Sequence, residues 1–237
     1  MKRLFLAALC LAASVVTAAA QAVVQDVGGT QLLYSGPANP RAIAFMFAGS
    51  DATVGFNAAG QVTHLNGNFL MRTENLWLAQ GFGFATLASA SSLNGRRSTP
   101  AYAATIAQAI DALRARANAP VWLIGTSMGS IGAANGAAHL PGRVAGVVLS
   151  SSVAGPNRAS GETVFDGDPG AIAVPALIVA PQILAALTRS PRKEIIYVES
   201  HQIQSDPCEA LSPHGYLGIE ADVVQRIADW IRATPTH

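Results

Sequence analysis

The stretch VWLIGTSMGSIGAA, Val121 to Ala134, joins an apolar run to a pentapeptide of the form G-x-S-x-G. The run Val121–Ile124 has the length and composition of a buried strand. The small residues after Ser127 predict a helix that begins at once and lies close to its neighbours. A strand that enters a helix through this pentapeptide holds its serine in a strained and exposed turn. The stretch therefore predicts that Ser127 is a nucleophile at the carboxyl end of a strand.

Two other interpretations of the pentapeptide are a tight turn with an incidental serine and a phosphate-binding loop. A Walker-type loop needs the pattern G-x-x-x-x-G-K-[ST], and no lysine stands at that place. In the nucleophile interpretation, the first helical amide, that of Met128, can donate to a developing oxyanion. The choice between a nucleophile and an incidental serine then depends on which residues the fold brings to Ser127.

Apolar runs with the length of strands recur along the chain, at 42–47, 82–87, 144–149, 174–179 and 194–198. Segments that favour helices separate or follow them, at 69–80, 102–117, 131–140, 183–188 and 220–232. Because each run is almost continuously apolar, both faces of each strand are expected to be buried. This alternation predicts an α/β fold, with a mostly parallel sheet covered by helices on both faces.

The first twenty residues have the pattern of a secretory signal peptide. Lys2 and Arg3 precede an apolar core, and small residues then offer cleavage after Ala20 or Ala22. We expect residues 1–20 to be removed, and 21–237 to form a single domain that is periplasmic or secreted. No later segment approaches the run of about 18 apolar residues that spans a membrane. No membrane association is expected after cleavage.

Composition excludes several classes of partner. Charged residues make up 12% of the chain, the formal net charge is +1, and no basic stripe is present, so nucleic-acid binding is not expected. His64, His139 and His237 lack carboxylate or cysteine neighbours at ligand spacing, so neither a metal nor a cofactor is expected. No pattern in the sequence determines an oligomeric state.

The G-x-S-x-G turn and the order of strands and helices resemble the α/β-hydrolase superfamily, in particular its small exported bacterial members. The resemblance extends over nearly the whole mature chain and implies a minimal α/β-hydrolase fold without a large cap. It implies that His214, in the loop between the last strand and the last helix, is the base that serves Ser127. The alternatives are a surface role for His214, and His201 of the same loop as the base.

The same resemblance implies an oxyanion hole formed by the backbone amides of Met128 and Ser50. Ser50 lies in the turn after the strand 42–47, where the family has its second donor. This chain lacks the H-G-G-G form that many esterases carry in that turn. Gly49 and Asp51 therefore stay as alternatives to Ser50.

The chain departs from the family pattern at the third catalytic residue. The family normally has an aspartate just after the strand 174–179, yet no Asp or Glu lies between Asp168 and Glu194. Related exported hydrolases tend to carry a longer loop there, with an Asp closely followed by a Cys. The resemblance thus implies that Cys208 is one half of a disulfide whose partner was lost, with a reactive thiol as the alternative.

A relocated acid is the remaining possibility for a complete triad. The sequence favours Asp206, because it lies beside Cys208 and before Pro207 in a loop that can turn toward His214. Competing carboxylates are Glu209, Glu199, Asp166 and Asp168. The alternative is that Asp206 has no catalytic role and is a solvated loop acid beside a turn-forming proline.

Two functions follow from these observations. The first is an exported serine hydrolase that acts on a carboxylic ester or similar acyl compound, with acyltransfer to an alcohol as a variant of the same chemistry. The second is a catalytically degraded, hydrolase-like protein that binds a ligand or has no activity. The loops 51–68, 89–100 and 150–170 are expected to line a pocket for a small, uncharged and moderately apolar substrate.

Overall fold

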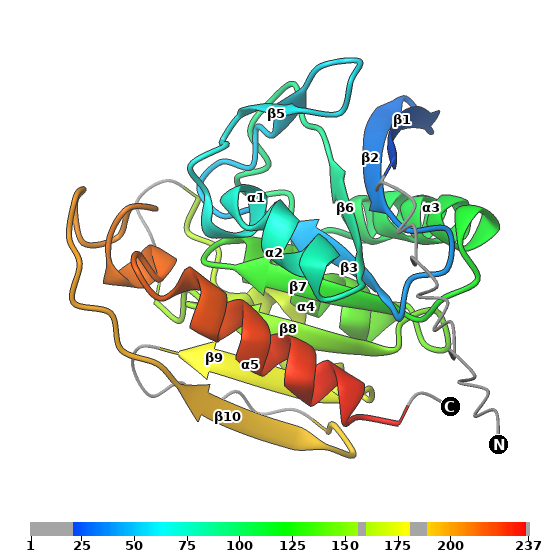
Figure 1. The fold of residues 1–237 in the computed structure, drawn as a ribbon. Helices are drawn as coiled ribbons and strands as arrows, with labels where there is room; N and C mark the ends of the chain where they lie inside the picture. The colour runs from blue at the N-terminus through cyan, green and yellow to red at the C-terminus, as the bar shows by residue number, and fades with distance from the viewer. Residues whose placement is uncertain (1–20, 156–159, 181–188, 236–237) are drawn as a thin grey trace, which may run out of the picture.

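The computed structural model describes residues 21–155, 160–180 and 189–235. Within these ranges eight strands form one sheet in the order β1-β2-β6-β3-β7-β8-β9-β10 (Figure 1). Their bounds are β1 Gln21–Val27, β2 Thr30–Gly36, β3 Ile43–Phe47, β6 Gly83–Leu87, β7 Val121–Thr126, β8 Gly146–Ser150, β9 Ala176–Ala180 and β10 Lys193–Tyr197. The strands from β6 to β10 pair in parallel, which confirms the predicted sheet.

An antiparallel hairpin, β1–β2, extends this sheet at one edge and was not predicted. It turns at Gly28 and Gly29, which both have positive φ, and β2 then pairs antiparallel with β6. A separate pair of short strands, β4 Gly55–Phe56 and β5 Val62–His64, lies in the loop between β3 and the next helix. That loop was expected to border the pocket.

Helices cover both faces of the sheet (Figure 1). The α-helices are α1 Phe69–Arg72, α2 Glu74–Ala79, α3 Pro100–Arg116, α4 Gly129–His139 and α5 Glu220–Arg232, and the 3₁₀ turns are η1 Val164–Gly167, η2 Pro169–Ala171 and η3 Pro213–Gly215. Residues of α1, α2 and α5 form one core with side chains such as Met46 and Ile124. Residues of α3 and α4 form the second core with Phe45 and Leu123. Neighbouring residues of one strand thus enter opposite cores, which explains the continuously apolar runs.

The small residues of α4 allow the helix to lie directly on the sheet, as predicted. A Cβ added at Gly136 would lie 2.7 Å from Leu123 Cδ1, and one added at Gly132 would lie 2.8 Å from the Tyr102 ring. Both distances are below van der Waals contact, so a larger residue would push the helix away. This close packing fixes the start of α4, and with it the turn at Ser127.

Three predicted elements need comment. The expected helix 69–80 is divided at Thr73, whose hydroxyl donates to the carbonyl oxygen of Phe69 at 2.8 Å. The helix predicted at 183–188 and the signal peptide predicted at 1–20 both lie outside the described residues. Because β1 begins at Gln21, cleavage after Ala22 would remove the first two residues of that strand. Among the described residues, no helix has the length and hydropathy needed to cross a bilayer.

Candidate active site

Ser127 occupies a sharp turn between β7 and α4. Its φ of +54° is in the left-handed region, which a residue with a side chain rarely adopts. The backbone N–H of Ser127 donates to the carbonyl oxygen of Ser150 at 2.9 Å, so the strained turn is fixed to the neighbouring strand β8. The local structure predicted for the G-x-S-x-G stretch is therefore present.

Three glycines make this turn sterically possible. A Cβ at Gly125 would lie 2.6 Å from the carbonyl oxygen of Gly129, and a Cβ at Gly129 would overlap the carbonyl oxygen of Phe47. Opposite the turn, a Cβ at Gly49 would lie 2.9 Å from Ser127 Cβ and 3.5 Å from its Oγ. Without side chains at these positions, the loop after β3 can approach Ser127 closely.

The turn after β3 presents a backbone amide beside Ser127. Ser50 has a φ of +53°, and the N–H of Ala52 closes the turn on the carbonyl oxygen of Gly49 at 3.1 Å. Among the described residues, neither the Ser50 nor the Met128 N–H donates a hydrogen bond, so both are available to a ligand in the cleft. The amide of Asp51 instead faces its own carboxylate. This arrangement favours Ser50 over Asp51 as the second oxyanion donor.

Arg97 binds the carbonyl oxygen of the Ser50 peptide group. Its guanidinium donates to the Ser50 carbonyl oxygen at 2.5 Å and to Asn94 Oδ1 at 3.2 Å, and the side chain is only 1% exposed. Burial lowers the pKa of Arg97, while electrostatic interactions with Tyr102, Glu162 and Asp51 act in the opposite direction. A buried cation with these partners gives the Ser50 turn a fixed orientation. Sequence reasoning did not single out Arg97.

His214 lies in η3, and three contacts hold its backbone. Its N–H donates to Ser212 Oγ at 3.2 Å, and its carbonyl oxygen accepts from Ser151 Oγ at 2.8 Å. The next residue, Gly215, has its carbonyl oxygen bound by Arg72 at 2.6 Å. The loop after β10 is therefore tied to Ser151, just after β8, and to Arg72 at the end of α1.

Arg72, at the end of α1, connects several segments through one guanidinium. It donates to the carbonyl oxygens of Gly67, Ala210 and Gly215 at 2.7, 3.3 and 2.6 Å. Its ion pair with Glu220, at 3.0 Å, reaches the first residue of α5. The planar guanidinium fits this fork of acceptors, which a lysine cannot reproduce. Arg72 was missed in the sequence, where it is an isolated cation in an apolar helix.

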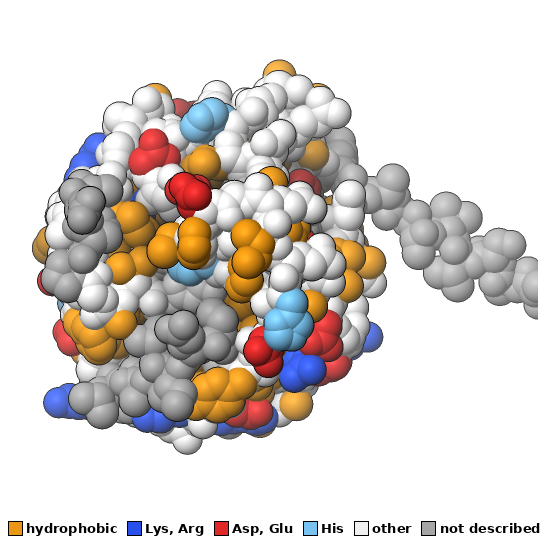
Figure 2. All heavy atoms as spheres, turned by 90° about the vertical axis from the view of Figure 1, so that its left-hand side faces the viewer, with side chains coloured by type: hydrophobic (Ala, Val, Ile, Leu, Met, Phe, Trp, Pro, Cys, Tyr) orange, Lys and Arg blue, Asp and Glu red, His pale blue; other side chains and the backbone are white. Residues whose placement is uncertain are grey.

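Ser127 and His214 line the same cleft of about 900 Å³, together with Ser50 and Met128. Figure 2 shows this side of the molecule, where the parallel strands end and hydrophobic side chains gather. The Nε2 of His214 is buried and has no hydrogen-bond partner among the described residues. Burial lowers the pKa of His214, and the negative charge of Glu209 opposes this shift. The exposed His201 does not line the cleft, so the structure favours His214 over it.

Comparison with known proteins agrees with this architecture. No family model and no curated protein match the sequence. An α/β-hydrolase enzyme from a lagoon-sediment metagenome matches with a TM-score of 0.59 and 11% identity, over 89% of this chain and 98% of that one. An esterase of Pyrococcus furiosus matches with a TM-score of 0.60 and 10% identity, over 90% of both chains. This chain has the α/β-hydrolase fold.

A further α/β-hydrolase neighbour is a cold-adapted esterase from an Arctic intertidal metagenomic library. It matches with a TM-score of 0.59 and 14% identity, over 88% of this chain and 92% of that one. At such identities the likeness concerns the fold. The chemistry has to be argued from the residues of the cleft itself.

Of the two carboxylates near Cys208 in this α/β-hydrolase fold, Glu209 lines the cleft with His214 and Asp206 does not; Asp51 lines it from the turn after β3. Asp206 as the acid stays a prediction, and Glu209 is its rival. The Glu209 N–H donates to the Asp206 carbonyl oxygen at 2.9 Å, and the chain reverses at this turn. Both carboxylates are exposed, and Glu209, with its neighbours Cys208 and Ala210, lines the cleft.

The other candidate acids are occupied or distant. The Asp166 carboxylate accepts hydrogen bonds from the backbone N–H and the hydroxyl of Thr163 and so caps η1. Asp168 Oδ2 lies 3.9 Å from His139 Nε2. Glu199 is exposed. Within 21–155, 160–180 and 189–235, no carboxylate forms a hydrogen bond or ion pair with His214. The segment just after β9, where the family has its acid, falls outside the described residues.

Two other groups of the α/β-hydrolase cleft bear on its chemistry. Cys208 is a free thiol, exposed at the rim of the cleft. Its origin as half of a lost disulfide stays a prediction.

The carboxylate of Asp51 is partly desolvated, which raises its pKa, yet hydrogen bonds from Thr53 outweigh this and the pKa is lowered overall. In the described part of the chain, no cluster of three or more His, Cys, Asp or Glu residues has metal-binding geometry.

Proposed function

We propose that this protein is an exported serine hydrolase that cleaves a carboxylic ester or similar acyl compound through Ser127 and His214. The observation that carries the proposal is that Ser127, in its left-handed turn, lines one cleft with His214, whose buried Nε2 has no hydrogen-bond partner among the described residues. An unpaired buried nitrogen costs free energy, so its retention points to a role toward a ligand. Export rests on the signal-peptide pattern of residues 1–20, and N-terminal sequencing of the secreted or periplasmic protein tests it.

The proposed reaction has two steps. Ser127 Oγ attacks the acyl carbon while His214 Nε2 accepts its proton, and the alcohol then leaves with that proton. Water, deprotonated by His214, attacks the resulting acyl-enzyme; the bond between the acyl carbon and Ser127 Oγ breaks, His214 returns the proton to Oγ, and the acid is released. The N–H groups of Met128 and Ser50 stabilise the oxyanion in both steps. The lowered pKa of His214 keeps the imidazole neutral near pH 7, as a base requires.

The cleft favours an uncharged substrate. Its described lining includes apolar side chains such as Leu65, Phe69 and Val153, and the charged groups are the carboxylates of Asp51 and Glu209. No Lys or Arg is among the described residues that line it, so a carboxylate on the substrate would meet like charge and no counter-ion. Esterase activity of the structural neighbours is consistent with a neutral acyl ester.

The proposal is tested by labelling the folded protein with a fluorophosphonate and mapping the adduct by mass spectrometry. We expect one adduct, on Ser127, which disappears after heat denaturation and in Ser127→Ala. A folded protein that forms no adduct would instead favour the hydrolase-like binding protein. An adduct on another serine would remove Ser127 from the proposed mechanism.

The role of Glu209 is tested by the pH dependence of ester hydrolysis. Because His214 acts as a neutral base, kcat/KM falls as pH decreases through its pKa. The Glu209 charge raises this pKa, so Glu209→Gln should lower it further and move the acid limb of the profile to lower pH. Asp206→Asn, the matched control in the same turn, should leave the limb in place.

Two outcomes would change this interpretation. An unchanged acid limb in Glu209→Gln would show that its charge does not reach His214. A loss of kcat approaching 10⁴-fold at the pH optimum, in either variant, would identify that carboxylate as the orienting acid of the triad.

Arg72 is expected to act as a positioning residue. Arg72→Ala removes the link between α1, the His214 loop and Glu220, so the loop that carries His214 should lose part of its fixed position. We expect kcat to fall about 10- to 100-fold with KM changed less than about threefold, since small misplacements of a base have effects of this size. Arg226→Ala, which removes an exposed pair with Asp222, is the control. If Arg72→Ala lowers only the melting temperature, and kcat per folded enzyme is unchanged, the role is purely structural.

A further inference from the structure

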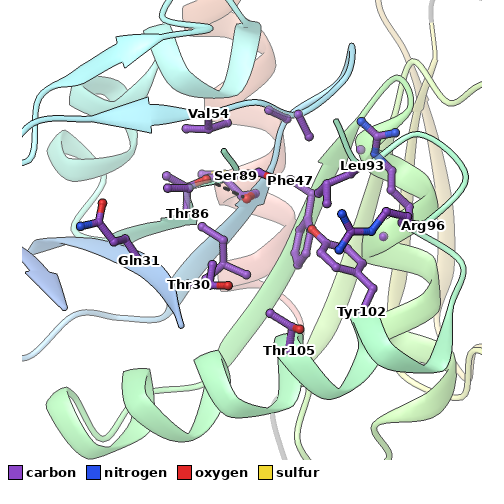
Figure 3. A pocket seen from close by; sticks show the side chains of 18 of the residues that line it. Thr30, Gln31, Phe47, Val54, Thr86, Ser89, Leu93, Arg96, Tyr102 and Thr105 are labelled. Carbon is purple, nitrogen blue, oxygen red and sulfur yellow. Dashed lines mark hydrogen bonds between the residues drawn. The ribbon is translucent and has the colours of Figure 1, made fainter. Parts of the chain in front are cut away.

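A second cavity, of about 370 Å³, lies at the ends of β3 and β6, beside the start of α3. Figure 3 shows side chains from β2, β3, β6, the loop after β6 and α3 around it. Its lining includes Phe47, Val54, Leu93, Arg96 and Tyr102. None of the residues that line the cleft of Ser127 and His214 lines this cavity.

Closely packed backbone at Gly129 and Gly49 lies between the two cavities. Gly129 packs so closely on the end of β3 that an added Cβ would overlap the Phe47 carbonyl oxygen and lie 2.7 Å from that of Ala48. On the cleft side, Gly49 is packed against Ser127 in the same way. A ligand in the second cavity therefore contacts Ala48 and Ala52, on either side of the Ser50 turn, without reaching Ser127. The inference does not depend on the proposed function.

The floor of the cavity is apolar and its wall offers a hydrogen-bond donor. The ring of Tyr102 meets Phe47 edge-on, with centroids 6.4 Å apart. The Tyr102 hydroxyl forms no hydrogen bond with any described residue. Burial raises the pKa of Tyr102 to about 12, against the opposing charge of Arg97, so the hydroxyl stays protonated and can donate. An apolar body with a polar end matches these surroundings.

Two charged residues, Arg96 and Arg97, are among the described residues that line the cavity. Arg97 is already bound to the Ser50 carbonyl oxygen and to Asn94, and the charges of Glu162 and Asp51 act on it. Arg96 is exposed, and its one side-chain hydrogen bond with a described residue is a long contact of 3.4 Å with Ser91 Oγ. Figure 3 shows Arg96 and Tyr102 on the same side of the cavity. The cavity therefore has a cation available for an anionic ligand.

We propose that this cavity is a second binding site, which takes a small carboxylate with an apolar body. The carboxylate binds Arg96 and the Tyr102 hydroxyl, and the body packs on Phe47, Val54 and Leu93. The two sites differ in charge: arginines line this cavity, whereas the carboxylates among the described lining residues of the cleft are acidic groups. Because Ala48 and Ala52 flank the Ser50 turn, occupancy of the cavity is expected to stiffen that turn.

The test is a nuclear magnetic resonance titration of the mature protein with 3-phenylpropionate, with neutral 3-phenylpropionamide as the matched probe. For a ligand of this size we expect a Kd in the millimolar range. Saturable shifts should appear at the amides of Phe47, Leu93 and Tyr102, and the amide probe should bind at least about tenfold more weakly.

Variants identify the groups that bind the carboxylate. Arg96→Gln should weaken binding about tenfold or more, and Tyr102→Phe about threefold to tenfold, while Arg226→Gln should have no effect. Equal binding of the two probes would overturn the anion site. Saturable shifts confined to the cleft residues 67–69 and 210–215, or no saturable shifts at all, would overturn the cavity as a binding site.

Discussion

Ser127→Ala should reduce kcat/KM for a short p-nitrophenyl ester by at least about 10³-fold, to a rate close to that of the oxyanion hole alone. The reason is that Ser127 is the proposed nucleophile: it occupies the left-handed turn opposite Gly49 and lines the cleft with Met128 and Ser50. Initial rates of purified wild-type and variant protein, compared at equal concentration of folded protein, give the measurement.

Ser130→Ala is the matched control, because Ser130 lies three residues further along the same turn and helix. Its hydroxyl is buried and donates to the carbonyl oxygens of Gly125 and Ser150, away from the cleft. We expect its turnover to change less than about threefold, with a loss of stability of about 1 kcal/mol. Equal activity of Ser127→Ala and wild type would exclude Ser127 as the nucleophile, and a large loss of turnover in Ser130→Ala would show that the turn itself had been disturbed.

Gly129→Ala should destabilise the fold by about 3 kcal/mol or more. The added Cβ meets the carbonyl oxygens of Phe47 and Ala48, which belong to the backbone at the end of the central strand β3 and cannot rotate away. Either α4 must move off the sheet or β3 must shift, and both changes disturb the core. Urea unfolding followed by circular dichroism measures the effect as a lower midpoint with a similar slope.

Gly155→Ala provides the comparison for this prediction. A Cβ at Gly155 would meet no atom of a described residue within 4 Å, and its φ lies outside the left-handed region. Its stability should change by less than about 0.5 kcal/mol. If the two alanine variants unfold at the same urea concentration, the contact between α4 and the end of β3 is not rigid.

Strands that are buried on both faces could be predicted from the sequence. Strands β3, β7 and β8 are buried on both faces, so their sequences are apolar throughout and stand out from the loops. The hairpin strand β1, with the sequence QAVVQDV, lies at the edge and mixes polar with apolar residues. It forms a strand because it pairs with β2, and no local sequence pattern predicts this pairing.

The sequence by itself determined the turn at Ser127, because glycine and serine spacing sets backbone geometry over five residues. It also indicated His214, since the loop before the last helix has a defined position in the order of elements. Only the tertiary structure placed Glu209 in the lining of the cleft and revealed the contacts of Arg72 and Arg97. These depend on long-range contacts, such as that of Arg72 with Gly215, 143 residues away. A side-chain hydrogen bond needs placement within about 0.5 Å, and such precision comes from packing of distant segments rather than from local sequence.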